Sequence, residues 1–280
     1  MRFGAPLFES FTSPQEWAEI VVKRNYGAAY SPIGLGASDG EAIAYGKAAK
    51  DAGIVIAEQG AWGVNCLSTD VKERDKALAA CIRGLELAEL LGARCCVALS
   101  GSRAQKWDAP HKANFSRGAL EDIASNVRKI IDAVDPKNTY YTLEPMPWTL
   151  PCDAKSELKL LEMIDRSAYA VHYDPVNMVY SPERYFDSGK FITDFVEELA
   201  SFIRVVHLKD IMLLDAFVWQ LHERVPGDGE LDYDTLLTCI SKLDPDLPVI
   251  TEHLSCQEDY DKAEVFIRGR AKELGLEFVA

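Results

Sequence analysis

The stretch IRVVHLKDIM, residues 203 to 212, joins a run typical of a buried strand to three ionisable residues. Its first half is apolar and β-branched, whereas His207, Lys209 and Asp210 follow within four positions. Burying an ionised side chain costs free energy unless it is paired or coordinates a metal, so charges at the end of such a strand indicate a functional site. The residues at the ends of the other predicted strands therefore decide both the fold and the site.

Eight segments of this strand type recur along the chain, and amphipathic helical patterns separate them. The strand segments are 2–8, 28–33, 53–61, 94–101, 140–146, 169–175, 203–212 and 247–254. The helical patterns cover 13–25, 72–92, 118–133, 155–165, 190–201, 232–242 and 258–274. Strands that alternate with helices predict parallel βα repeats, and eight of them close a barrel. We therefore predict an α/β fold, a single (β/α)8 TIM barrel with parallel strands.

One domain accounts for residues 1–280, because no Pro/Gly/Ser-rich linker or shift in composition divides them. The length suits one α/β barrel, which needs roughly 250 residues. An open, doubly wound sheet is the main alternative. However, the first strand–helix junction lacks the GxGxxG pattern of the dinucleotide-binding form of that fold.

The composition excludes several classes of protein. The formal net charge is −14, without a basic cluster, so nucleic acids and membrane surfaces are not expected partners. The N-terminus does not resemble a secretory signal, and no apolar run approaches the roughly 20 residues that span a bilayer. Seven cysteines without CxxC pairs favour a reducing compartment, so we expect a cytoplasmic protein. The sequence leaves open whether the chain forms a homo-oligomer.

Four strand segments in the second half of the chain end in potential metal ligands. These are Glu144, Asp174, His207 and Glu252, which lie 30, 33 and 45 residues apart. The first two separations match one βα repeat, and the third is lengthened by 211–231, for which we expect irregular structure. Each residue therefore occupies the same place in its repeat, at the C-terminal rim where the loops of a barrel converge.

Three carboxylates gathered at one rim need a counter-charge, because like charges disfavour each other's ionisation and burial adds to the cost. A divalent cation supplies that charge. Three oxygen donors and one imidazole, without a thiolate, favour Mn²⁺, with Mg²⁺ or Co²⁺ as alternatives, over a closed structural Zn²⁺ site. Such a site would keep open positions for substrate oxygens.

The Glu, Asp, His, Glu order resembles the xylose isomerase-like TIM-barrel superfamily of sugar isomerases and epimerases. The resemblance covers nearly the whole chain. It also rests on three passages: HLKD after the seventh strand, PGDGELDYDTLL before the eighth, and ELAELLGARCCVALSG. It implies that Glu144, Asp174, His207 and Glu252 bind the metal. It further implies that Glu144 and Glu252 act as acid/base catalysts.

This chemistry predicts a divalent-metal-dependent sugar or keto-polyol isomerase or epimerase. Its carboxylates would transfer a proton through a metal-stabilised enediolate. The same site could instead dehydrate a keto-inositol or a related cyclic polyol, because loss of a β-hydroxyl starts from the same enediolate. A non-catalytic sugar-binding barrel is less favoured because both Glu144 and Glu252 are present. The superfamily also resembles abasic-site endonucleases, but those need more histidine ligands than this chain, with five histidines in all, is expected to provide.

Three polar residues are candidates for substrate binding. Lys209 shares a strand face with His207, so it contacts either a substrate oxygen or a rim carboxylate. Asn177 stands three residues after Asp174, where epimerases of this superfamily carry a histidine. Those epimerases also carry an arginine shortly after the strand-seven histidine, where this chain has IMLLDAF, so Arg224 is a candidate to replace it.

Several other residues have two interpretations. Trp148, just past the fifth strand segment, either stacks on a sugar face or packs in the protein, and Glu58 could line the pocket. His172 is either a core residue or a partner of the site, whereas His253 is expected at the surface or in packing. The loop PGDG could present backbone N–H groups to substrate.

Overall fold

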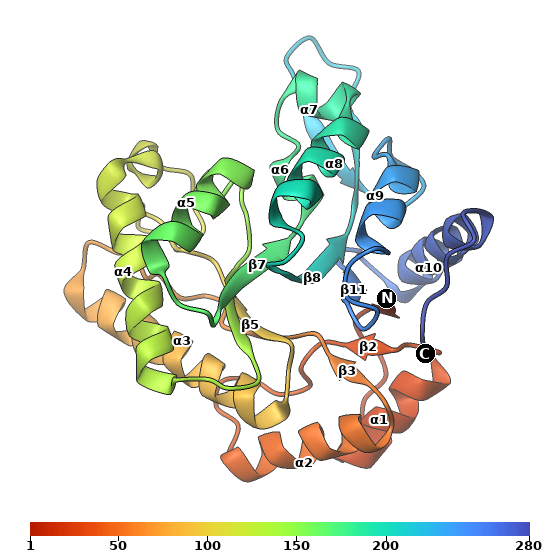
Figure 1. Cartoon of the computed structure of the whole chain (residues 1–280), viewed down its shortest axis with the longest axis horizontal. Helices are drawn as coiled ribbons and strands as arrows, with labels where there is room; N and C mark the ends of the chain where they lie inside the picture. Colours follow the sequence, from red (N-terminus) through yellow and green to blue (C-terminus); the bar gives the residue numbers. More distant parts are fainter.

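A curled sheet of parallel strands, covered by helices on its outer face, forms the centre of the computed structural model, which describes residues 1–280 (Figure 1). Its seven strands follow the order β1-β11-β8-β7-β6-β5-β4. Their bounds are β1 Arg2–Gly4, β4 Glu58–Gly60, β5 Cys95–Ala98, β6 Tyr140–Leu143, β7 Tyr169–Tyr173, β8 Ile203–Leu208 and β11 Pro248–Thr251. The strands alternate with helices in sequence, as the predicted α/β barrel requires.

Two short strands complete the curl. β2 (Ala28–Ala29) pairs in parallel with β3 (Val55–Ile56), and β3 continues into β4 after one residue. Gly27 N donates to Phe3 O on β1 at 3.0 Å, and Val55 N donates to Gly27 O at 3.0 Å. A Cβ on Gly4 would lie 2.2 Å from the carbonyl oxygen of Ala28, so only glycine permits this approach. All eight predicted strand segments contain a strand, and the TIM-barrel prediction is confirmed.

Eight longer helices follow the strands. They are α1 Pro14–Lys23, α2 Asp39–Asp51, α3 Val71–Leu91, α4 Arg117–Val134, α5 Ala154–Ile164, α8 Ser188–Leu199, α9 Tyr233–Ile240 and α10 Gln257–Glu273. Short turns of helix occur at η1 Lys112–Phe115, α6 Pro175–Met178 and α7 Pro182–Phe186. No helix is long and apolar enough to cross a bilayer.

The helical patterns missed α2, whose sequence DGEAIAYGKAAKD is rich in small residues and weakly amphipathic. A local signal was present, because Ser38 caps the helix by accepting a hydrogen bond from the backbone N–H of Glu41. The expected helix ends at Pro14 and Gly92 are confirmed; Gly92 adopts the left-handed conformation, with φ 67°, that terminates α3.

The irregular structure expected for 211–231 was wrong in its first part. β9 (Asp210–Leu213) and β10 (Leu221–Arg224) pair antiparallel as a hairpin, whose turn extends beside α7 at the top of Figure 1. The apolar IMLL therefore belongs to a strand that leaves the barrel rim.

The carboxylate of Asp210 ties this hairpin to the loop that follows it. It accepts backbone N–H groups of Ile211 at 2.8 Å, Gly227 at 2.9 Å, Gly229 at 3.1 Å and Leu231 at 3.0 Å. The N–H groups of Gly227 and Gly229 are thus directed to Asp210, contrary to the expectation that this loop presents its backbone to substrate.

A buried carboxyl group between α5 and β7 gives a testable pH dependence. Glu157 on α5 is fully buried and accepts a hydrogen bond from the Tyr169 hydroxyl at 3.1 Å. Burial raises its pKa from 4.5 to about 8. Since the folded protein holds this proton more tightly than the unfolded chain, the free energy of unfolding falls as pH rises from about 4.5 to 8.

We expect Glu157→Gln to be more stable than the wild type at pH 8, by about 2 to 4 kcal/mol, and to differ little at pH 5. The amide keeps an oxygen for Tyr169 and cannot ionise. Urea unfolding at the two pH values measures this, with the exposed Glu162→Gln on the same helix as the control. A stability difference that does not change with pH would contradict the assignment.

Candidate metal centre

The four predicted ligands meet at the C-terminal rim of the barrel. Glu144 follows β6, Asp174 follows β7, His207 lies near the end of β8 and Glu252 follows β11. These strands are neighbours in the sheet, so their ends lie side by side. His207 Nδ1 lies 2.9 Å from Glu252 Oε1, 3.8 Å from Glu144 Oε1 and 4.0 Å from Asp174 Oδ2. One donor atom of each residue lies within 4.8 Å of all the others.

The donor atoms of this cluster fit a divalent cation. Asp174 Oδ2, His207 Nδ1 and Glu252 Oε1 are buried and converge on one another. Lys209 supplies a single positive charge against the three buried carboxylates of the cluster, so the surplus of negative charge favours a bound cation. Three carboxylates and one imidazole without a thiolate form the oxygen-rich set that Mn²⁺ or Mg²⁺ prefers.

Lys209 enters the same cluster and is 2% exposed. Its Nζ lies 2.7 Å from Asp174 Oδ2, 2.9 Å from Glu252 Oε1 and 3.2 Å from Glu223 Oε1. Burial lowers the pKa of Lys209, but these carboxylates outweigh burial and hold it well above its ordinary value. The structure thus shows the pairing with carboxylates, one of the two alternatives, and places a fixed positive charge beside the cluster.

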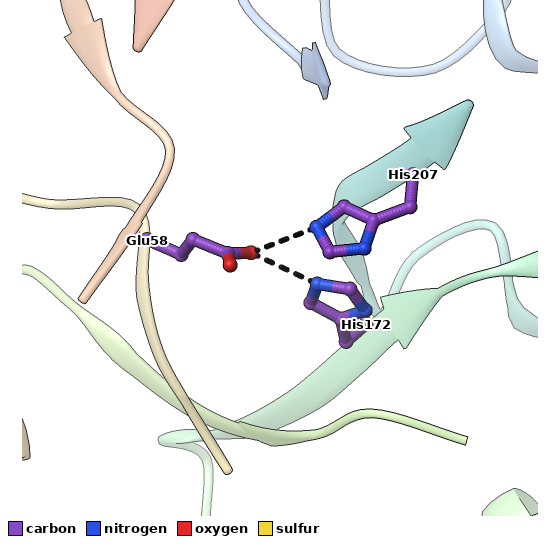
Figure 2. Close-up of side chains that lie close together, drawn as sticks. All are labelled: Glu58, His172 and His207. Carbon is purple, nitrogen blue, oxygen red and sulfur yellow. Dashed lines mark hydrogen bonds and ion pairs between the residues drawn. The ribbon is translucent and has the colours of Figure 1, made fainter. Parts of the chain in front are cut away.

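Beneath the four donors lies a second layer, formed by Glu58, His172 and His207. Figure 2 shows the Glu58 carboxylate reaching both imidazoles: its Oε2 lies 2.9 Å from His172 Nε2 and 3.3 Å from His207 Nε2. All three residues are buried. Burial would raise the pKa of Glu58, but the charges and hydrogen bonds of the two histidines lower it to about 2.

An ionised Glu58 determines which nitrogen of His207 carries a proton. Only an N–H can donate to a carboxylate, so Nε2 is protonated, and a cation bound at the four-residue cluster would meet the lone pair of Nδ1. Sequence reasoning placed Glu58 in the pocket lining, where it does lie, but missed this role. His172 is a partner of the site through Glu58, from which it is 114 residues distant in the chain.

We expect Glu58→Gln to weaken Mn²⁺ binding about 10- to 100-fold, because loss of the buried charge releases the orientation of His207. Isothermal titration calorimetry on the folded variant measures the Kd. Glu157→Gln is the matched control, since it changes a buried glutamate far from the cluster. An unchanged Kd in Glu58→Gln would show that Glu58 does not position His207.

A cavity of about 1100 Å³ lies over the cluster, lined by 22 residues of which 13 are hydrophobic. The lining includes five residues singled out from the sequence: Glu58, Glu144, Glu252, Asn177 and Trp148. Asn177 bridges two of the polar groups: its amide donates to Glu144 Oε1 at 3.0 Å and its carbonyl accepts from Lys209 Nζ at 2.9 Å.

Arg224 does not line this cavity. It lies on β10 in an adjoining, smaller pocket of about 210 Å³, which shares Glu223, Glu252 and His253 with the main cavity. Because residues alternate between the two faces of a strand, the neighbouring Glu223 lines both pockets whereas Arg224 lines only the smaller one.

Glu223 and His253 are among the cavity residues that were missed from the sequence. Glu223 belongs to the hairpin that was taken as irregular, so no strand parity was available for it. His253, expected at the surface or in packing, is half-exposed but lines the cavity, with Nδ1 3.3 Å from Glu223 Oε1. Its positive φ of 60° breaks the strand alternation on which that expectation relied.

A family model described as "Xylose isomerase-like TIM barrel" matches residues 17–268. A search of curated proteins found no match. The similar solved structures include a D-tagatose 3-epimerase-like protein, with a TM-score of 0.71 at 18% identity and 98% of both chains covered.

Two further solved structures resemble the chain over most of its length. Endonuclease IV from Thermus thermophilus has a TM-score of 0.71 at 18% identity, with 98% of this chain and 100% of that chain covered. A xylose isomerase-like TIM-barrel protein from Mycobacterium smegmatis in complex with magnesium has a TM-score of 0.67 at 16% identity, covering 94% of this chain and 90% of that one. At these identities the likeness establishes the fold and leaves the reaction open.

Proposed function

We propose a function that starts from one premise: the chain belongs to the xylose isomerase-like TIM-barrel family. The protein is a divalent-metal-dependent isomerase or epimerase of a sugar or keto-polyol. One observation carries this proposal: donor atoms of Glu144, Asp174, His207 and Glu252 converge within 4.8 Å of one another at a cavity large enough for a substrate. Ligand sites on this fold lie at the same rim of the barrel.

Glu144, Asp174, His207 and Glu252 hold the cation, for which Mn²⁺ is our first choice and Mg²⁺ or Co²⁺ the alternatives. The magnesium complex of the Mycobacterium smegmatis neighbour supports a hard divalent ion. When bound there, the cation would act as a Lewis acid toward the carbonyl and adjacent hydroxyl of a ketose and would ease removal of the neighbouring proton.

Glu144 and Glu252 move the proton. Along the sheet, β7 and β8 separate β6 from β11, so the two carboxylates flank the cluster from its two sides. One can remove a proton from the substrate carbon and the other can return one, which gives epimerisation or isomerisation. Lys209, charged and hydrogen-bonded to Asn177, offers its ammonium to a substrate oxygen that gains negative charge.

Solvent exchange tests this proposal. Purified protein with Mn²⁺ is incubated with a panel of ketoses and keto-polyols in D₂O and followed by NMR. We expect deuterium at the carbon next to the carbonyl without loss of water. An absorbing enone product would instead identify a dehydratase on the same site, and absence of both reactions across the panel would overturn the proposal.

DNA cleavage, the activity named for the Thermus thermophilus neighbour, is not favoured for this chain. The formal net charge is −14, and the cavity holds Glu58, Glu144, Glu223 and Glu252. A phosphodiester backbone is bound by positive charge, and its approach to this surface is opposed by repulsion.

A further inference from the structure

We propose that the substrate carries a bulky aromatic substituent beside its sugar or polyol ring. This inference rests on the proposed function and specifies the class of substrate. Its first support is the composition of the cavity: four of the five tryptophans of the chain line it, namely Trp62, Trp107, Trp148 and Trp219. The fifth, Trp17, is buried in the core.

The cavity is larger than a free monosaccharide requires. Its volume of about 1100 Å³ lies just above the roughly 300 to 1,000 Å³ of pockets that hold drug-sized ligands, and a hexose is much smaller than such ligands. A hexose bound at the carboxylates would leave most of the aromatic wall uncovered. Because burial of apolar surface stabilises a complex, a substituent that covers this wall would contribute to binding.

The polar and apolar linings come from different parts of the chain. The polar part at the barrel rim is formed by Glu58, Glu144, Glu252 and Asn177. The hairpin β9–β10 contributes Ile211, Trp219 and Leu221, with Glu223 as its one charged residue in the lining. This mainly apolar wall offers few groups to bind further hydroxyls, but it suits an aromatic group.

Trp219 is held in place by other aromatic rings. Its ring packs edge-to-face on Tyr185, with centroids 5.7 Å apart, and on Phe186, with centroids 6.1 Å apart. Such packing restricts the side chain, so the wall is formed before a ligand binds. A cavity with a carboxylate-rich part and a preformed tryptophan wall matches an amphipathic molecule: a polyol ring that carries an aryl group.

Binding of matched glycosides tests the inference without turnover. The probes are phenyl and methyl β-D-glucopyranoside and the corresponding galactosides, titrated into the Mn²⁺-loaded full chain. Tryptophan fluorescence reports directly on the cavity, and calorimetry provides the Kd. We expect at least one phenyl glycoside to bind about 10-fold more tightly, or better, than its methyl counterpart. Equal affinity within each pair, or no binding by any phenyl glycoside, would overturn the inference.

Variants of the cavity tryptophans test which side chains cause the preference for phenyl over methyl glycosides. Trp219→Ala should reduce the phenyl-to-methyl ratio to below about 3-fold, whereas Trp219→Phe should retain most of it, because a ring still faces the ligand. Phe202→Ala is the control: this partly exposed ring precedes β8 at the opposite end of the barrel, and its loss should leave the ratio unchanged. An undiminished ratio in Trp219→Ala, with Trp148→Ala also undiminished, would overturn the aromatic subsite.

The outcomes separate this inference from the proposed function. Solvent exchange with ketoses but no phenyl preference overturns the aromatic substituent and leaves the isomerase proposal intact. A phenyl preference without solvent exchange, even on aryl-substituted keto-sugars, overturns the isomerase proposal and supports the aromatic subsite.

Discussion

Glu252→Gln is expected to lower kcat at saturating Mn²⁺ by about 10²- to 10⁴-fold, because a positioned general base contributes a factor of that size and an amide cannot accept the proton. Glu252 Oε1 lies between two cationic groups, 2.9 Å from His207 Nδ1 and 2.9 Å from Lys209 Nζ. Burial would raise the pKa of Glu252, but these charges outweigh burial and hold it well below its ordinary value. The carboxylate is therefore ionised.

Two measurements keep this effect distinct from lost metal binding. The Mn²⁺ Kd of the variant is determined first, and kcat and deuterium exchange are then measured with the site saturated. Glu223→Gln is the matched control, since that carboxylate also lines the cavity and lies 3.2 Å from Lys209 Nζ but does not belong to the four-donor cluster. We expect its kcat to fall far less. Substantial turnover in Glu252→Gln would show that the two-carboxylate mechanism is wrong.

Asp174→Asn is expected to weaken Mn²⁺ binding by at least about 100-fold, because it removes a charged ligand and directs an amide toward the cation. Asp174 is fully buried, and its two oxygens have different tasks. Oδ1 accepts the backbone N–H of Asn177 at 3.1 Å and caps α6, whereas Oδ2 faces the cluster, 2.7 Å from Lys209 Nζ. Asparagine keeps the cap and the shape, so the change isolates the charge.

Calorimetry with Mn²⁺ measures this loss, and thermal unfolding of the metal-free variant confirms that it folds. Glu223→Gln should change the Kd by less than about threefold, because a partly exposed carboxylate outside the cluster is screened by solvent. If Asp174→Asn bound Mn²⁺ as tightly as the wild type, the four-residue assignment would fail. Chelation of the metal from the wild type should abolish the solvent exchange, and added Mn²⁺ should restore it.

Local patterns account for the parts of this protein that the sequence predicts well. Helical periodicity and the caps at Ser13 and Gly92 depend on residues a few positions apart, so they are visible in a single chain. The convergence of Glu144, Asp174, His207 and Glu252 follows from one additional rule, that parallel strands end at one rim. No such rule predicts the hairpin β9–β10, because its strands leave the barrel and the turn that joins them contains no glycine.

By itself, the sequence determined the barrel and the four donors at its rim, because strand alternation and repeat length fix where each strand ends. Only the tertiary structure decided which charges surround those donors. The pairing of Glu58 with His172 spans 114 residues, and Trp219 reaches the cavity only because the hairpin folds beside α7. Such contacts depend on how the sheet curls and closes, and no local spacing encodes them. The electrostatics of the site, and the aromatic wall above it, are therefore consequences of the closed barrel.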